Sequence, residues 1–211
     1  MKKALLIQLV ILCVVIAGTA YVYPSLPSQL ASHWSASGVV NGMLPRTIGV
    51  SVLPLLMLFM LGLFELLPRI DPLTRTGSSE VARRMGIFAC TILLFLGLVQ
   101  GLMLYWNLGH QVNLTTDLLI ALALLFFVIG RLFDGLPRNS FFGIRTPWTL
   151  TNDQVWNETH TKAGFAYQLA SLAMLVGLFF PTLALWFLLI PLLVATVYGI
   201  GVSYYSSRTN V

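Results

Sequence analysis

Residues 183–204 read LALWFLLIPLLVATVYGIGVSY and contain no charged side chain. Crossing the hydrocarbon core of a bilayer takes about 20 consecutive apolar residues in a helix. Backbone groups inside lipid must satisfy one another, which favours a helix over an open strand. This stretch therefore predicts a membrane-spanning helix.

Five further runs in the chain have the same apolar character. The complete set is Ala4–Val22, Ile48–Leu67, Gly86–Trp106, Thr115–Phe133, Phe165–Phe180 and Leu183–Tyr204. The fifth run would extend only about 24 Å as a helix, so we expect this helix to begin earlier, near Thr159 or His160. The sequence predicts an all-α, polytopic membrane protein with six transmembrane helices.

The overall composition agrees with a chain surrounded by the lipid bilayer. Apolar residues make up 57% of it, charged residues only 9%, and the mean hydropathy is +0.86. A soluble globular chain carries about 25% charged residues. These values exclude a soluble enzyme, a disordered chain and a nucleic-acid-binding domain, so no nucleic-acid partner is expected.

The positive charges predict the orientation in the membrane. Of the 12 Lys and Arg residues, all but Arg46 fall on the side that includes both termini, Arg75 and the basic residues of the inner loop. Lys and Arg favour the cytoplasmic side, so we expect a multi-pass plasma-membrane protein with both termini cytoplasmic. The first run also has the layout of a cleaved signal peptide, but no polar boundary follows Ala20, which favours an uncleaved anchor.

The connections divide the chain into three predicted parts. Residues 1–67 form an N-terminal two-helix module with an outer loop, 68–134 a middle hairpin, and 135–211 a signature loop with a last hairpin. The longest loops are Tyr23–Thr47 outside and Asp134–Gly164 inside. Each face of the membrane therefore offers one place for specific contacts.

The outer loop combines a titratable side chain with an aromatic one, His33 and Trp34. Asn41-Gly42 is a dipeptide typical of tight turns, because both residues tolerate positive φ. One interpretation is a folded cap with Trp34 anchored at the membrane surface and His33 bonded beside it. The other is direct contact with a ligand.

The inner loop carries more local signals. Gly143 permits a sharp bend, and Pro147 favours an extended residue before it. Thr151 and Gln154 have the spacing of a capping box, which predicts a helix from about Asn152. That helix would place Asn152, Trp156, His160 and Gly164 on one face.

Two interpretations of the inner loop remain open. In the first, an interfacial helix holds Trp148 and Trp156 at headgroup depth while Arg138 and Arg145 bind lipid phosphates. In the second, Arg145, Trp148, Trp156 and His160 form a preorganised docking site. The rigid fork of donors on Arg145 would then be essential, whereas Arg138 would remain a headgroup contact that lysine could replace.

Both loops resemble one known family, that of SdpI, which comprises membrane immunity proteins against a secreted toxic peptide. The outer residues Leu26-Pro27-x-x-Leu30-x-x-His33-Trp34-x-x-x-Gly38-x-x-Asn41-Gly42 are similar to the short N-terminal membrane module of unknown function found there. The inner residues from Asn139 to Gly164, including Phe142-Gly143-Ile144-Arg145-Thr146-Pro147-Trp148, match the family signature more completely. This chain departs from the family by having Asn41 at a position that is often Asp. A carboxylate is therefore not expected to be needed there.

The resemblance implies a non-enzymatic protein that binds a peptide toxin or another ligand on the outer face and a cytosolic regulator on the inner face. The candidate contact residues are His33, Trp34, Gly38, Asn41, Asn139, Phe142, Gly143, Arg145, Thr146, Pro147, Trp148, Asn152, Trp156 and His160.

An enzyme is not expected, because the chain lacks the usual nucleophile, metal-ligand and phosphate-loop motifs. The three histidines are dispersed in the sequence, so no metal and no cofactor is predicted. A small transporter or permease-like protein is the alternative. It would require the uncharged Gln100 and Gln168, the deeper polar residues of the spans, to line a watery path.

Overall fold

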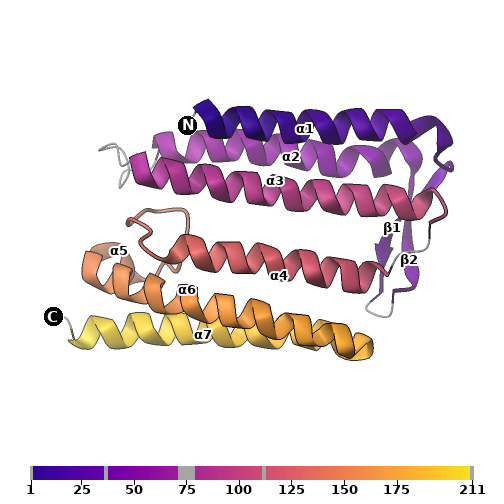
Figure 1. Cartoon of the computed structure of the whole chain (residues 1–211). Coiled ribbons are helices and arrows are strands. Elements are labelled where there is room, and N and C mark those ends of the chain that lie inside the picture. The colour runs from indigo at the N-terminus through magenta and orange to yellow at the C-terminus, as the bar shows by residue number, and fades with distance from the viewer. Residues whose placement is uncertain (1, 36–37, 71–78, 111–112, 210–211) are drawn as a thin grey trace.

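Six long helices lie side by side in the computed structural model, which describes residues 2–35, 38–70, 79–110 and 113–209 (Figure 1). They are α1 (Lys2–Val22), α2 (Arg46–Ile70), α3 (Ser79–Asn107), α4 (Leu114–Phe133), α6 (Asp153–Val176) and α7 (Ala184–Thr209). Each is long and apolar enough to cross a membrane. The predicted all-α, six-span membrane protein is confirmed.

The fifth span begins earlier than its apolar run suggests. The side chain of Asn152 accepts hydrogen bonds from the backbone N–H groups of Gln154 and Val155, which starts α6 at Asp153. The predicted start near Thr159 or His160 is therefore too late. The polar helix expected from about Asn152 and the fifth transmembrane helix are one continuous helix.

The helices pack as two groups of three. α1, α2 and α3 contact one another, α6 packs against both α4 and α7, and α3 joins the groups by packing on α4 (Figure 1). The two helices of the expected middle part, 68–134, thus pack with different groups, and the three-part division of the chain stays a prediction. Both termini lie at the same end of the bundle, while Arg75 is outside the described residues.

A small antiparallel sheet lies at the end opposite the termini (Figure 1). Its strands are β1 (Gln29–Trp34) and β2 (Val40–Pro45). The predicted turn at Asn41-Gly42 is wrong, since both residues lie within β2 opposite β1. Gly42 is needed for close approach, because a Cβ there would lie 2.8 Å from the Cβ of His33. The chain reverses instead between Ser35 and Val39, where Gly38 has φ 78°.

The side of the membrane on which each end lies can be measured by cysteine labelling. Val39 is exposed on the hairpin and Thr151 is exposed at the opposite end. In a chain with Cys13→Ala and Cys90→Ala, Val39→Cys should react with a membrane-impermeant maleimide in intact cells. Thr151→Cys should react only after permeabilisation, because the basic loops favour the cytoplasm. Labelling of Thr151→Cys in intact cells would show the reverse orientation.

Candidate functional site

The outer candidate residues come together on the β-hairpin. His33 Nδ1 lies 2.5 Å from Asn41 Oδ1, so these side chains pair across the two strands. The ring of Trp34 meets Trp106 of α3 edge-on, with the centroids 5.6 Å apart. Gly38 supplies the positive φ of the reversal. Their role as ligand contacts stays a prediction, while their contacts with one another define the shape of the hairpin.

Asn107, at the last residue of α3, fixes the hairpin to the helical bundle. Its Oδ1 accepts from the N–H of Ala31 at 2.8 Å, and its Nδ2 donates to the carbonyl of Ala31 at 3.0 Å. Ala31 is fully buried beneath this contact. Sequence reasoning missed Asn107, because no local pattern relates residues so far apart in the chain.

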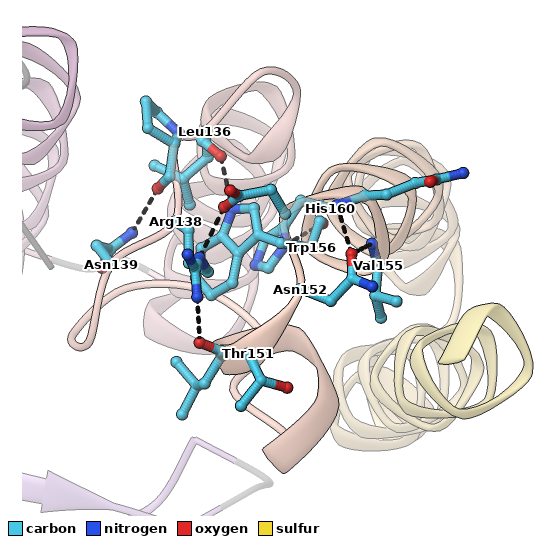
Figure 2. A network of polar contacts seen from close by, with 12 residues as sticks. Leu136, Arg138, Asn139, Thr151, Asn152, Val155, Trp156 and His160 are labelled. Carbon is cyan, nitrogen blue, oxygen red and sulfur yellow. Dashed lines mark hydrogen bonds and ion pairs between the residues drawn. The ribbon is translucent and has the colours of Figure 1, made fainter. Parts of the chain in front are cut away.

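At the end of the bundle that carries the termini, Trp156 is a structural centre rather than a surface anchor. Its side chain is 0% exposed, and its Nε1 donates to the carbonyl of Leu136 at 2.6 Å (Figure 2). Trp156 is therefore enclosed by protein and cannot act as an anchor in contact with lipid headgroups. The helix stripe proposed from sequence does exist, but this residue faces the loop between α4 and the short helix α5 (Pro147–Thr151).

His160, one helical turn after Trp156, holds the same loop from a second point. Its Nδ1 lies 2.7 Å from the carbonyl of Trp156, and its Nε2 accepts from the N–H of Ile144 at 2.9 Å. The ring is therefore neutral and carries its proton on Nδ1. Gly143 passes directly over this ring with φ 114°, and a Cβ there would overlap Nε2. The glycine is required by both its backbone conformation and the close approach.

Two further candidates of the signature bend the loop through their side chains. Asn139 is 1% exposed, and its Oδ1 accepts from the N–H groups of Phe141 and Phe142. Thr146 begins α5 in a capping box with Thr149, each side chain bonding the backbone of the other. These contacts satisfy buried backbone groups that have no partner in a helix or sheet.

The helix caps differ from the pattern read in the sequence. Thr151 and Gln154 were expected to form the capping box, but Thr151 is the last residue of α5 and its hydroxyl bonds back to the carbonyl of Pro147. Asn152 is the residue that caps α6. The chain thus places two helices where the spacing suggested one, so the expected role of Thr151 is wrong.

Of the two arginines of the loop, Arg138 makes other contacts than expected, whereas Arg145 stays exposed. Arg138, expected to be a lipid contact, donates from Nε to Asp153 Oδ1 at 2.7 Å and from Nη1 to the carbonyl of Leu150 at 2.5 Å (Figure 2). Both of these partners of its guanidinium group belong to the protein. Arg145 is exposed, and its Nη1 donates to the carbonyl of Ser140. Arg145 therefore remains available to a partner, whereas Arg138 ties α5 to α6.

The loop also depends on residues from α3 and α7 that sequence reasoning missed. Arg84 of α3 donates from Nη1 to the carbonyls of Leu132 and Asp134, at 2.9 and 2.6 Å. Ser203 of α7 lies 3.3 Å from the hydroxyl of Thr146. Both are remote in sequence, so only the fold brings them to the loop.

The remaining inner candidates are distributed between the surface and the core. Pro147 is exposed, whereas Phe142 is buried and stacks near Phe88 of α3. Trp148 is half-buried and meets Tyr204 edge-on at 5.7 Å. A partner approaching this face would therefore meet Arg145, Pro147 and part of Trp148, but neither Trp156 nor His160.

No group of three or more His, Cys, Asp or Glu side chains that could hold a metal ion occurs in the described part of the chain. The polar groups of the loop described above instead form hydrogen bonds with other groups of the protein. The arrangement can hold a backbone in one conformation and present a small exposed surface.

Comparison with known proteins gives two family matches and one curated relative. The model of the SdpI/YfhL protein family matches residues 135–205, and that of a domain of unknown function (DUF1648) matches residues 9–58. The immunity protein SdpI of Bacillus subtilis (strain 168) is 27% identical over 158 residues, which cover 74% of this chain and 72% of that protein.

Residues 135–205 thus match the SdpI/YfhL family, and most of the chain is similar to the immunity protein SdpI.

No solved structure matches the chain. The inner signature lies inside the match to the SdpI/YfhL family, and the outer hairpin lies inside the match to the domain of unknown function. The resemblance seen in the two loops is thereby confirmed over most of the chain.

The close approach at Gly143 gives a stability prediction with a matched control. Gly143→Ala places a side chain at positive φ and against His160, whereas Gly109→Ala shares the positive φ (91°) in open space. We expect Gly143→Ala to lower the free energy of unfolding by about 2–4 kcal/mol and Gly109→Ala by about 1 kcal/mol. Thermal unfolding in detergent measures both. Equal losses would mean that the loop shifts away from His160 without cost.

The different contacts of Arg138 and Arg145 give a second stability prediction. Lysine at position 138 cannot reach both Asp153 and the carbonyl of Leu150, so Arg138→Lys should cost about 1 kcal/mol. Arg145→Lys, at an exposed side chain, should change stability by no more than a few tenths of a kcal/mol. Both are read as shifts of the unfolding midpoint in the same detergent. A larger loss for Arg145→Lys would contradict the assignment.

Proposed function

We propose that this chain protects a cell membrane against a membrane-active peptide by binding that peptide from the outer side, without chemistry on it. The observation that carries the proposal is the likeness to an immunity protein over 74% of the chain. The family matches at residues 135–205 and 9–58 support it. That likeness supports a membrane immunity-type function and points to a non-enzymatic role.

In this proposal the outer hairpin and the inner loop contact different partners. The outer hairpin, with His33, Trp34, Gly38 and Asn41, is the expected place for a peptide ligand. The inner loop is a rigid platform whose exposed Arg145 and Pro147 are the expected contact for a cytosolic regulator. The buried members of the signature act in this proposal by holding the platform in one conformation.

The transport hypothesis rests on two polar side chains inside the helices, Gln100 and Gln168. Oε1 of Gln100 is buried and has no partner among the described residues, but the amide nitrogens of both residues bond within the protein. Gln100 donates from Nε2 to the hydroxyl of Thr19 and to the carbonyl of Val50, which joins three helices. Gln168 donates to the carbonyl of Gly164 in its own helix. Such bonds contribute about 0.6–2 kcal/mol to helix association, and binding remains the better-supported function.

Protection can be measured directly in a sensitive host. Cells expressing the chain should survive at least one member of a panel of secreted membrane-active peptides at several times the concentration that kills cells with empty vector. Arg145→Lys, at equal membrane abundance, should retain protection, because Arg145 belongs to the loop between α4 and α5, at the end of the bundle opposite the hairpin. Equal killing of the two strains across the panel would contradict the proposal. Loss of protection in Arg145→Lys alone would move the ligand site to the inner face.

A further inference from the structure

A groove of about 430 Å³ lies between α1 and α2, toward the hairpin end of both helices. Tyr23 and Val50 line it near the hairpin, while Ile16 and Leu55 line its deeper part and are 49% and 62% exposed. In a helix, residues 16–23 extend about 10 Å, which fits within the half-thickness of about 15 Å that one leaflet contributes to the hydrocarbon core. The groove is therefore open to lipid and is contained in one leaflet.

The groove exists because small residues and a proline line the two helices. Ala20 contributes only a methyl group to the lining, and Pro54 lies inside α2. Since proline has no N–H, the carbonyl of Val50 lacks its partner within the helix. Gln100 of α3 supplies that partner, because its Nε2 donates to this carbonyl at 3.1 Å and to the hydroxyl of Thr19 at 3.2 Å.

The lining offers few hydrogen-bonding groups to an occupant. The hydroxyl of Thr19 accepts from Gln100, and that of Ser51 donates to the carbonyl of Thr47 at 2.7 Å. Tyr23, the remaining polar side chain of the lining, lies at its hairpin end. An extended peptide would bring backbone N–H and C=O groups that need partners in lipid. A hydrocarbon chain has no such groups, so the lining favours an acyl chain.

Arg46, the first residue of α2, places a cation at the hairpin end of the groove. Its guanidinium carbon lies 4.5 Å from the centre of the Tyr23 ring, and its Nη1 donates to the carbonyls of Tyr23 and Leu26 at 3.4 and 3.0 Å. Its Nε and Nη2 bond to no described residue. Neither is among the buried, unpaired polar atoms of the described chain, so both are accessible to a ligand.

The free donors of Arg46 have the geometry that a phosphate requires. Nε and Nη2 form one edge of the guanidinium plane, and their parallel N–H groups fit two oxygens of one phosphate. Because Nη1 is held by two backbone carbonyls, this edge is fixed in orientation before a ligand arrives. Arg46 precedes Val50 by one helical turn, about 6 Å, so the cation and the apolar lining follow one another along α2.

We propose that a phospholipid binds here, with one acyl chain in the groove between α1 and α2 and its phosphate on the Nε and Nη2 edge of Arg46. A free phosphate would use Arg46 but leave the groove empty. An uncharged peptide would use the groove but leave the donors of Arg46 without an acceptor. A phospholipid matches both, in the order in which headgroup and chain succeed one another in a leaflet.

Photo-crosslinking of the purified full chain in detergent tests this site. The first probe is phosphatidylglycerol with a diazirine in the middle of one acyl chain. The second is diacylglycerol with the same chains, which lacks the phosphate. The third is a mixture of N-acetylated apolar nonapeptides with a free terminal carboxylate and one photoreactive leucine. Labelled residues are mapped by mass spectrometry, with Leu124 on α4, 64% exposed and outside the groove, as the reference for unspecific lipid contact.

Phosphatidylglycerol should label Ile16, Ala20 and Leu55 about tenfold more than Leu124, and diacylglycerol should label them about tenfold less than phosphatidylglycerol does. Arg46→Gln should lower phosphatidylglycerol labelling of the groove to the level of diacylglycerol and leave diacylglycerol labelling unchanged. This comparison separates the contact with phosphate from the bonds of Arg46 to the backbone, because a distorted groove would lose both probes.

Two identical substitutions on α1 test the groove itself. Ala20→Trp fills it and should reduce phosphatidylglycerol labelling of Ile16 and Leu55 about tenfold. Ala17→Trp, also at an exposed alanine but outside the groove, should leave labelling within about twofold. The unfolding midpoint shows whether each variant has folded. If one has not, the comparison of the three probes on the unchanged chain still decides.

The outcomes do not depend on whether the chain protects any cell. Groove labelling that requires both the phosphate and Arg46 supports the proposal. Equal labelling of the groove and Leu124 would mean unspecific lipid contact only, and would overturn it. So would equal labelling by the two lipid probes, equal effects of Ala20→Trp and Ala17→Trp, or groove labelling by the peptides that phosphatidylglycerol does not reproduce.

Discussion

The buried indole of Trp156 and the imidazole of His160 hold a stretch of non-helical backbone against the bundle, and the inner half of the structure depends on this contact. Backbone outside a helix can lie near lipid only if protein groups satisfy its N–H and C=O. Here two rings on successive turns of α6 bond Leu136 and Ile144, at opposite ends of the loop. Gly143 lies between these points because only a residue without a side chain fits above the imidazole. Removing either ring would leave a buried backbone group unpaired.

This constraint explains why the signature reads as it does. Asn139, Thr146 and Asn152 each bond backbone N–H groups within a few residues of themselves. Their type and spacing are therefore fixed by the shape of the loop, with no ligand required. Most residues of a sequence motif can thus serve to hold the backbone in place. Only a few of them are exposed to a partner. Within this motif Arg145 is exposed, while Arg138 donates hydrogen bonds to Asp153 and to the carbonyl of Leu150.

The six spans could be predicted from sequence because lipid imposes a length and an apolar composition on any helix that crosses it. Local spacing was a weaker guide. The pair Thr151 and Gln154 has the pattern of a capping box, but the chain ends one helix and starts another between them. The dipeptide Asn41-Gly42 has turn chemistry, but Gly42 is there to let β2 approach His33. Both errors arise because a neighbouring segment, invisible to a local pattern, decides the conformation. The contact of Asn107 with Ala31 lies beyond local reasoning for the same reason.

The two ends of the bundle differ in how their polar groups are used, and the helices connect them. At the inner end, Arg84 of α3 and Ser203 of α7 bond the loop that follows α4. At the hairpin end, residues of the same three helices line an apolar groove. A movement of α4 relative to α3 or α7 at this end would act on helices whose other ends are joined by directed hydrogen bonds. Hydrogen bonds tolerate little change in distance or angle, so such a movement would be resisted by the inner loop or would alter it. A binding event on one face and a change in the exposed surface around Arg145 on the other would then be two consequences of one displacement.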